Sequence, residues 1–359
     1  MSDQHMLSDR DRREIQGLVL YGTTCPLLRY HFFQIADAVG GRRFVRSLVD
    51  SESPVQVSTA GSRDQNAASQ TLVYAGFTWR GLEALAVSTV SLGSFPLEFQ
   101  QGAKGRASQL GDAGESAPDR WLFDADAAHV AVVVYARQQD DLDTLSRQLL
   151  DMASTHACVL ISMLDGEALK DFTHPSGQEV TRPLHFGYSD GISQPELLPA
   201  LDRRPGTPPS VAPGMFILGH PDTSEGPPSA ASAPLPIPAA LGHNGTYAAF
   251  RMLEQDVDGY EEYLDSHASG PEARELLARG ADALAAVRLI RRGMPYGPAY
   301  DPSHKRDGNP RGLLGLFLCA NLKDQFEAVM SRWISAPEGA SPQSPIFNLQ
   351  SSIFNLRPP

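Results

Sequence analysis

The order of apolar patterns in the first half of the chain restricts the fold more than any other sequence feature. Strand-like patterns, which are short apolar runs rich in Val, Ala, Ile or Tyr, occur at residues 15–21, 71–77, 129–136 and 159–164. Helical spacing of apolar residues predicts helices at residues 30–48, 79–86 and 142–153. This alternation of strands and helices is typical of a ferredoxin-like unit with an antiparallel sheet.

The second half of the chain repeats the mixture of strands and helices after a long irregular connection. Residues 205–238 are crowded with Pro, Ser, Ala and Gly, which favour irregular structure. Strands are predicted at 246–253 and 312–319, and an amphipathic helix at 322–333. The closing residues 344–359 are apolar enough to pack on the body or on a second subunit. We therefore expect two halves, residues 1–165 and 166–359, with the functional site in the second.

One short stretch, His185 to Pro195, carries the strongest local signal for chemistry. Asp190 stands between Gly187 and Gly191, and glycines allow sharp turns and close approach of a flat ligand. An aspartate that is partly desolvated in such a turn has a raised pKa and is suited to proton transfer. The simpler interpretation is an Asx-turn, in which Asp190 bonds only its own backbone.

Further motifs follow in a fixed order along almost the whole chain. They are Phe95-Pro96, Leu110-Gly111-Asp112, Asn244-Gly245-Thr246-Tyr247, Phe250-Arg251, Arg291-Arg292-Gly293-Met294-Pro295-Tyr296-Gly297 and Arg311-Gly312-Leu313-Leu314. Together with the GxxDG of residues 187–191, this series resembles the dye-decolorizing peroxidases, a haem family. The resemblance implies an α+β fold of two ferredoxin-like units with antiparallel sheets, in the dimeric α+β barrel superfamily.

The resemblance also assigns roles to residues of the second half. Asp190 matches the distal acid/base of the family, and Arg291 matches its distal cation. Arginine suits this role because it stays charged and its planar fork can hold a polarised oxygen. The resemblance places the following residues around the pocket: Gly191, Ile192, Ser193, Gln194 and Leu316. The simpler interpretation of Arg291 is an ion pair with a nearby carboxylate such as Asp190.

The chain departs from the family where the proximal histidine that ligates haem iron is expected. The family carries that histidine in a motif resembling GAHIRKTNPR, shortly before the segment that contains Arg291. Residues 281–290 of this chain hold no His, Cys, Tyr or Met that could bind iron. The nearest upstream histidine is His267, which is interpreted either as a displaced ligand or as a surface loop residue. We therefore expect that no cofactor is bound, with haem as the alternative.

Three functions remain open at this point. The first is an enzyme that lost haem and uses Asp190 and Arg291 on a small organic substrate, for example in tailoring a secondary metabolite. The second is a haem-dependent peroxidase whose iron is held by His267. The third is a non-catalytic binding or assembly protein. Doubt about peroxidase activity rests on the missing proximal motif.

Composition and charge restrict the kinds of binding partner and the cellular location that we expect. The net charge of −12 argues against nucleic acid, and no apolar run approaches membrane-spanning length. Residues 1–13 are polar and charged, from which we expect no secretion leader. The three cysteines, Cys25, Cys158 and Cys319, have no metal-binding spacing and are expected to be buried free thiols in the cytoplasm. A small-molecule substrate and a possible homo-oligomer complete the expectations.

Overall fold

The computed structural model describes residues 7–62, 71–173, 179–187, 195, 197, 211–222, 233–267, 289–331 and 348–355. The strands are β1 (Leu27–Ile35), β2 (Thr71–Phe77), β3 (Val130–Ala136), β4 (Cys158–Glu167), β5 (Phe172–Thr173), β6 (Glu179–Val180), β7 (Tyr247–Glu254), β8 (Ile290–Tyr296), β9 (Gly312–Cys319) and β10 (Asn348–Asn355). The α-helices are α1 (Asp9–Glu14), α2 (Gly17–Leu20), α3 (Ala38–Ser47), α5 (Trp79–Ala84), α6 (Thr89–Gly93), α7 (Leu97–Gly105), α8 (Ala107–Leu110), α9 (Gln139–Thr155) and α10 (Val257–His267). A π-helical segment, η8 (Leu322–Glu327), follows β9.

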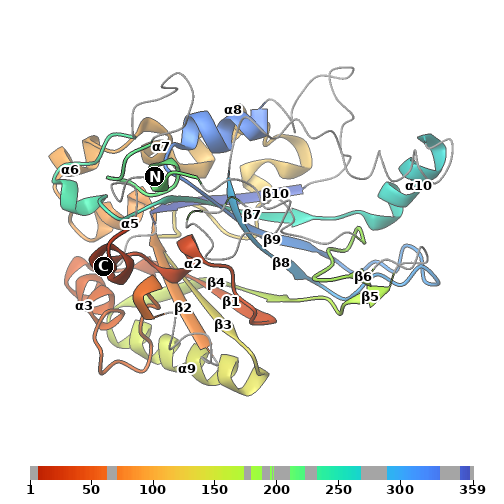
Figure 1. Cartoon of the computed structure of the whole chain (residues 1–359), viewed down its shortest axis with the longest axis horizontal. Helices are drawn as coiled ribbons and strands as arrows, with labels where there is room; N and C mark the ends of the chain where they lie inside the picture. Colours follow the sequence, from red (N-terminus) through yellow and green to blue (C-terminus); the bar gives the residue numbers. More distant parts are fainter. Residues whose placement is uncertain are drawn as a thin grey trace.

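Eight strands form one antiparallel sheet in the order β4-β1-β3-β2-β10-β7-β9-β8. Its first four strands come from the first half of the chain and its last four from the second half (Figure 1). Each set has the ferredoxin-like order, in which the first and third strands of the unit lie in the middle. Among the described residues, the two sets are joined by the backbone pairing of Asn355 with Phe77. The predicted fold class is confirmed.

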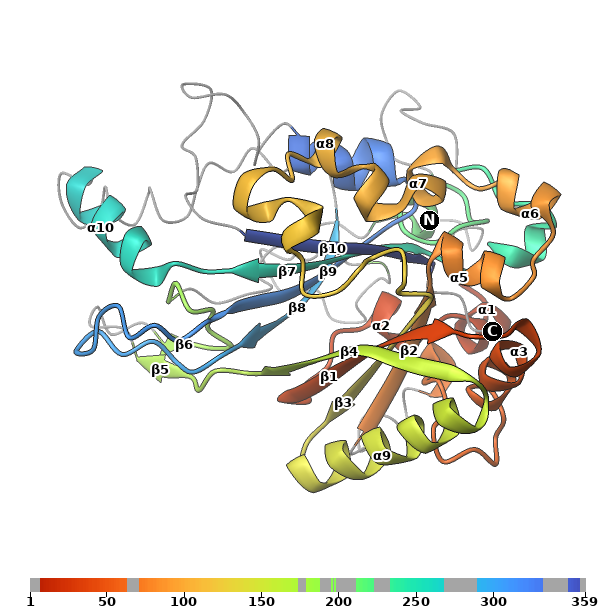
Figure 2. The same ribbon diagram turned by 180° about the vertical axis from the view of Figure 1, so that it is seen from behind.

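The two sets of strands enclose a shared apolar core. The ring centroid of Phe250 on β7 lies 4.9 Å from that of Tyr30 and 5.3 Å from that of Phe32, both on β1. The opposite faces carry helices: α9 and α3 lie beside the first-half strands, and α7, α8 and η8 beside the second-half strands (Figures 1 and 2). Because side chains alternate between faces, each strand residue is committed either to the shared core or to a helix layer.

Two predictions for the first 50 residues are wrong. Residues 15–21 form the short helix α2 after a bridge at Gln16, rather than a strand. The Gln16 side chain nevertheless extends the sheet, because its amide donates to Ala75 O at 2.7 Å and accepts from Ala75 N at 2.9 Å. Residues 30–48 are not one helix but the end of β1 followed by α3, because Asp37 caps the backbone amides of Val39 and Gly40 and starts a new element.

Other parts of the chain agree with the sequence predictions or add to them. β2 and β9 have the predicted bounds, and β10 shows that residues 348–355 of the closing stretch do pack on the body. Residues 102–118 contain the end of α7 and all of α8. All three cysteines are buried and free. Among the described residues, no helix has the length and apolar character needed to cross a membrane.

Buried His31 on β1 predicts a loss of stability in mild acid. Its Nε2 lies 2.7 Å from Ser146 Oγ under α9, and burial lowers the pKa of His31 to about 4. In the unfolded chain the pKa returns to about 6.5, so between these values only the unfolded state takes up the proton. The free energy of unfolding should therefore fall by about 3 kcal/mol as the pH drops from 6.5 to 4.

Denaturant unfolding at a series of pH values measures this dependence. His31→Gln keeps a polar side chain at the site but cannot titrate, and it should flatten the slope between pH 6.5 and 4. The control is His304→Gln, because the His304 side chain is 77% exposed. An equal slope in wild type and His31→Gln would show that His31 does not cause the loss.

Candidate functional site

Arg291 lies on the helix-covered face of the second-half strands. Its partner across β8 and β9 is Phe317, whose ring centroid is 5.8 Å from that of Phe326 in η8. The next residue, Arg292, points to the opposite face, where its guanidinium donates to the carbonyl oxygens of Leu18 and Val19. Arg291 is thus a half-buried cation between the sheet and a helix layer.

Leu316, which was expected to line the same pocket, lies on the other face. It pairs with Arg292, is 3% exposed and belongs to the core between the two sets of strands. Because the side-chain period of a strand is two, an offset of one residue moves a side chain to the opposite face. Leu313 and Phe317 of β9 share the face of Arg291 instead, and neither had been predicted to lie beside Arg291. Both residues lie an odd number of positions from Leu316 along the strand, and this spacing alone predicts that they point to the opposite face.

Asp190, Gly191, Ile192, Ser193 and Gln194 lie outside the described residues, so a site shared by Asp190 and Arg291 stays a prediction. The approach to this stretch is described. Gly187 has a φ of +81°, which is the turn geometry that favours glycine. His185 Nε2 donates to Tyr296 O at 2.8 Å. The stretch therefore starts from the end of the strand that carries Arg291.

Helix α10 packs against the same stretch and ends at His267. The ring centroids of Tyr260 and Phe186 are 4.4 Å apart. His267 is exposed, and its Nδ1 lies 2.9 Å from Tyr263 O and 2.8 Å from Ser266 Oγ. A carbonyl oxygen only accepts, so the contact with Tyr263 O is a hydrogen bond when Nδ1 carries the hydrogen.

The structure does not bring His267 against Arg291. α10 follows the end of β7 at Glu254, which lies in the same cross-strand row as Tyr296 at the end of β8. Arg291 lies near the other end of β8, in the row of Ala249. Residues 268–288, which connect His267 to β8, lie outside the described residues. Within the described ranges, no cluster of His, Cys, Asp or Glu could hold a metal ion.

Two ion pairs fasten first-half helices over the sheet face of Arg291. Arg251 on β7 contacts Asp112 at 2.6 Å, and both side chains are 0% exposed. Burial raises the pKa of Asp112, although Arg251 offsets part of this effect. Arg106 donates through Nε to Glu327 of η8 at 2.8 Å. The Leu110-Gly111-Asp112 and Phe250-Arg251 motifs therefore meet in space and build the helix layer above the candidate site.

Comparison with known proteins shows which proteins the chain resembles. Residues 14–168 match the DyP dimeric alpha+beta barrel domain. Peroxidase 2 of Mycetinis scorodonius is 28% identical over 283 residues, which cover 78% of this chain and 49% of that protein. The dye-decolorizing peroxidase of Mycena epipterygia is 26% identical over 293 residues, covering 81% of this chain and 50% of that protein. The chain is therefore similar to the dye-decolorizing peroxidases. It spans about half the length of the curated proteins that it matches.

Solved structures of dye-decolorizing peroxidases have the same fold as this chain. A dye-decolorizing peroxidase in complex with 2,6-dimethoxyphenol has a TM-score of 0.74 at 19% identity, covering 96% of this chain and 97% of the other. The decolorizing peroxidase from Auricularia auricula-judae has a TM-score of 0.70 at 18% identity, covering 97% of each chain. At these identities the likeness establishes the fold.

The comparisons contradict our expectation that no cofactor is bound. The curated relatives are peroxidases, and a solved dye-decolorizing peroxidase of TM-score 0.72, 17% identical, is described by its engineered haem pocket. Haem is therefore the expected cofactor, and the hypothesis of a haem-free tailoring enzyme loses its basis. One described residue suits the group, because Arg291 is a cation on a half-buried face. Exposed His267 follows the row at the other end of β8, so the described residues do not place an axial ligand opposite Arg291.

Proposed function

We propose that this chain is a haem-dependent peroxidase that uses a peroxide to oxidise a small organic substrate. The observation that carries the proposal is the place of Arg291, half-buried between the second-half strands and their helix layer. The hydrogen bond from His185 to Tyr296 supports it, because it ties the Asp190 stretch to the same strand. The family relationship supplies the class of reaction.

The proposed roles of the residues follow from their chemistry. Haem, when bound, supplies the redox centre of the reaction. The planar guanidinium fork of Arg291 stabilises negative charge that develops on a peroxide oxygen. Asp190 moves a proton from one peroxide oxygen to the other, which makes the departing oxygen a better leaving group.

His267 is the proposed axial ligand. Ligating histidines commonly donate their second ring N–H to a carbonyl, which fixes the ring and its tautomer. Tyr263 O accepts this bond, and the Tyr263 ring stacks on the imidazole with centroids 4.2 Å apart. Asp258 holds the start of α10 through Tyr300 Oη at 2.7 Å and Arg306 N at 2.8 Å, so the helix that presents His267 is anchored.

Absorption spectroscopy of the full chain, produced with a haem precursor, tests the proposal. We expect a stoichiometric Soret band, peroxide-dependent oxidation of a phenolic dye, and loss of the band in His267→Ala because the iron loses its protein ligand. His304→Ala is the matched control, since His304 is also an exposed histidine outside the proposed site. A wild-type protein without a Soret band would refute the function. A band that survives in His267→Ala would refute only the ligand assignment.

The substrate class and the location are also proposals. The substrate is taken to be a small molecule because the family members named above are peroxidases. The cytoplasm is proposed because all three thiols are free and buried, as in a reducing compartment.

A further inference from the structure

Arg292 connects the strand of Arg291 to the first half of the chain. Its guanidinium donates from Nε to Leu18 O at 2.8 Å and from Nη2 to Val19 O at 3.3 Å. Its Nη1 donates to the carbonyl oxygen of Arg291 itself at 3.2 Å. Leu18 and Val19 belong to α2, which lies between the first-half and the second-half strands (Figures 1 and 2). One planar fork therefore satisfies carbonyl oxygens at the end of a helix and holds the Arg291 peptide.

The α2 carbonyl oxygens that accept from Arg292 are themselves fixed in place. Leu18 and Val19 are each 1% exposed. Gly17 N donates to Ser58 O at 3.0 Å, and the preceding Gln16 side chain is bonded to β2. Because the backbone on both sides of α2 is hydrogen-bonded to the first-half body, the helix gives Arg292 a rigid point of attachment.

Strand β8 needs such an attachment because it is the last strand of the described sheet. It is hydrogen-bonded to β9 on one side, and an edge strand leaves backbone groups on its other side without a strand partner. On that open side Gly166 of β4 packs beside Met294 and Pro295, in the second half of the strand. Arg292 supplies the attachment at the end that carries Arg291. Since neighbouring side chains of a strand point to opposite faces, fixing Arg292 on one face fixes the backbone from which Arg291 projects on the other.

We propose that Arg292 is a positioning residue for Arg291, which it holds at the angle that the reaction with peroxide requires. The inference rests on the proposed function, in which the Arg291 guanidinium stabilises charge on a peroxide oxygen. Arg292 points to the opposite face of the sheet and acts only through the backbone of Arg291. A displacement of about 1 Å in a positioned group can lower a rate by up to about 100-fold, so losing this attachment should have a measurable effect on the reaction.

A double-mutant cycle on the full, haem-loaded chain tests this role by stopped-flow absorbance. Arg292→Met removes the three donors, and it should lower the rate constant with peroxide about tenfold. In the Arg291→Leu background it should change the rate by less than about twofold, because a residue that acts through Arg291 loses its effect when Arg291 is absent. Arg292→Lys keeps a donor but not the planar fork, so it should lose about threefold and serves if Arg292→Met does not fold. Equal losses in both backgrounds would overturn the proposal.

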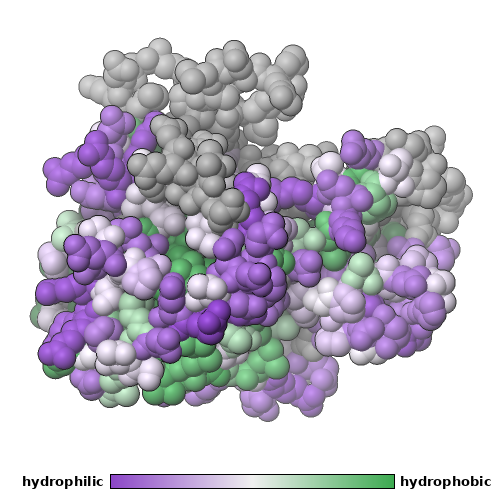
Figure 3. Space-filling view, turned by 90° about the horizontal axis from the view of Figure 1, so that it is seen from below, coloured by the Kyte–Doolittle hydropathy of each residue, from purple (hydrophilic) through white to green (hydrophobic). Residues whose placement is uncertain are grey.

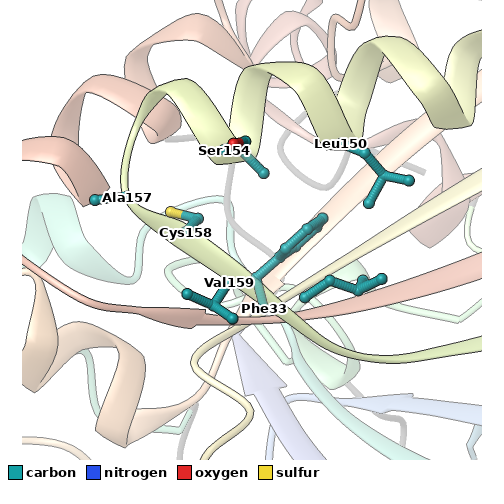
Figure 4. A pocket seen from close by; sticks show the side chains of 8 residues that line it. Phe33, Leu150, Ser154, Ala157, Cys158 and Val159 are labelled. Atoms are coloured by element: carbon teal, nitrogen blue, oxygen red, sulfur yellow. The ribbon is translucent and has the colours of Figure 1, made fainter.

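Leu150→Ala is the control that separates positioning from a general loss of stability. Leu150 lines an apolar cavity of about 310 Å³ between α9 and the start of β4, together with Phe33 and Cys158 (Figure 4). Seen from the α9 side, apolar side chains gather in one part of a mostly hydrophilic face (Figure 3). Truncation enlarges the cavity and destabilises the packing of α9 on β1, β3 and β4, but the peroxide rate should stay within about twofold of wild type. A tenfold loss in Leu150→Ala would overturn the proposal, because the rate would then report general loosening.

Hydrogen–deuterium exchange of the same proteins measures the attachment of β8 without depending on activity. In Arg292→Met the amides of residues 290–296 should exchange at least about fivefold faster, while those of residues 130–136 in β3 should not change. Unchanged exchange in β8 would show that Arg292 does not hold the strand, and faster exchange with a wild-type peroxide rate would show that the attachment does not position Arg291. Both results overturn the proposal and leave the proposed function standing. A wild-type protein that does not react with peroxide would refute the function, and the role of Arg292 with it.

Discussion

Asp112→Ala is expected to lower the free energy of unfolding by about 3–5 kcal/mol, because it leaves the guanidinium of Arg251 buried without its counter-charge. The Arg251 side chain is 0% exposed in the sheet–helix layer, and its Nη1 donates to Asp112 at 2.6 Å. Among the described residues no other group accepts from Arg251 Nε or Nη2. Urea unfolding followed by circular dichroism measures the loss.

The paired replacement separates loss of the ion pair from loss of packing. Arg251→Met with Asp112→Leu removes both charges and keeps most of the volume, so it should destabilise the protein by less than about half as much as Asp112→Ala. The control is Asp119→Ala, an exposed carboxylate in the same passage of the chain. If Asp112→Ala costs no more than Asp119→Ala, the pair does not hold the helix layer on the sheet.

Arg291→Leu is expected to slow the reaction with peroxide by about 10²–10³-fold, because a positioned cation that stabilises developing charge is worth several kcal/mol in the transition state. The Soret band should persist, since Arg291 is not the proposed iron ligand. Arg291→Lys keeps the charge but loses the planar fork, and it should recover only part of the rate. Stopped-flow absorbance at several peroxide concentrations measures the step.

The control for this prediction is Arg120→Leu, which removes an arginine side chain that is 55% exposed and pairs with Glu115. It should leave the peroxide rate unchanged. A wild-type rate in Arg291→Leu would remove Arg291 from the reaction and return it to a structural role. Loss of the Soret band together with the rate would instead show that Arg291 supports haem binding.

The sequence by itself predicted the fold class and five of the eight strands of the main sheet, β2, β3, β4, β7 and β9. Thr71–Phe77 and Gly312–Cys319 were predicted with their observed bounds, because buried strands need uninterrupted apolar side chains and both runs end abruptly. The wrong predictions fall where the local apolar pattern did not decide the secondary structure. Residues 15–21 look like a strand, yet only the Gln16 side chain joins the sheet. Residues 30–48 have helical periodicity throughout, yet the Asp37 cap separates the end of strand β1 from helix α3.

The sequence also named Arg291, but tertiary structure decided which face of the sheet it occupies and that Leu316 lies on the other. The decision comes from the register between β8 and β9, which a single strand does not encode. The same holds for Arg251 and Asp112, which are far apart in the chain and become an ion pair only when α8 packs on β7. The apolar edge at 159–164 reads in sequence as an ordinary buried strand. Its partial exposure follows from the position of β4 at the end of the sheet, where β1 is its hydrogen-bonded neighbour among the described strands.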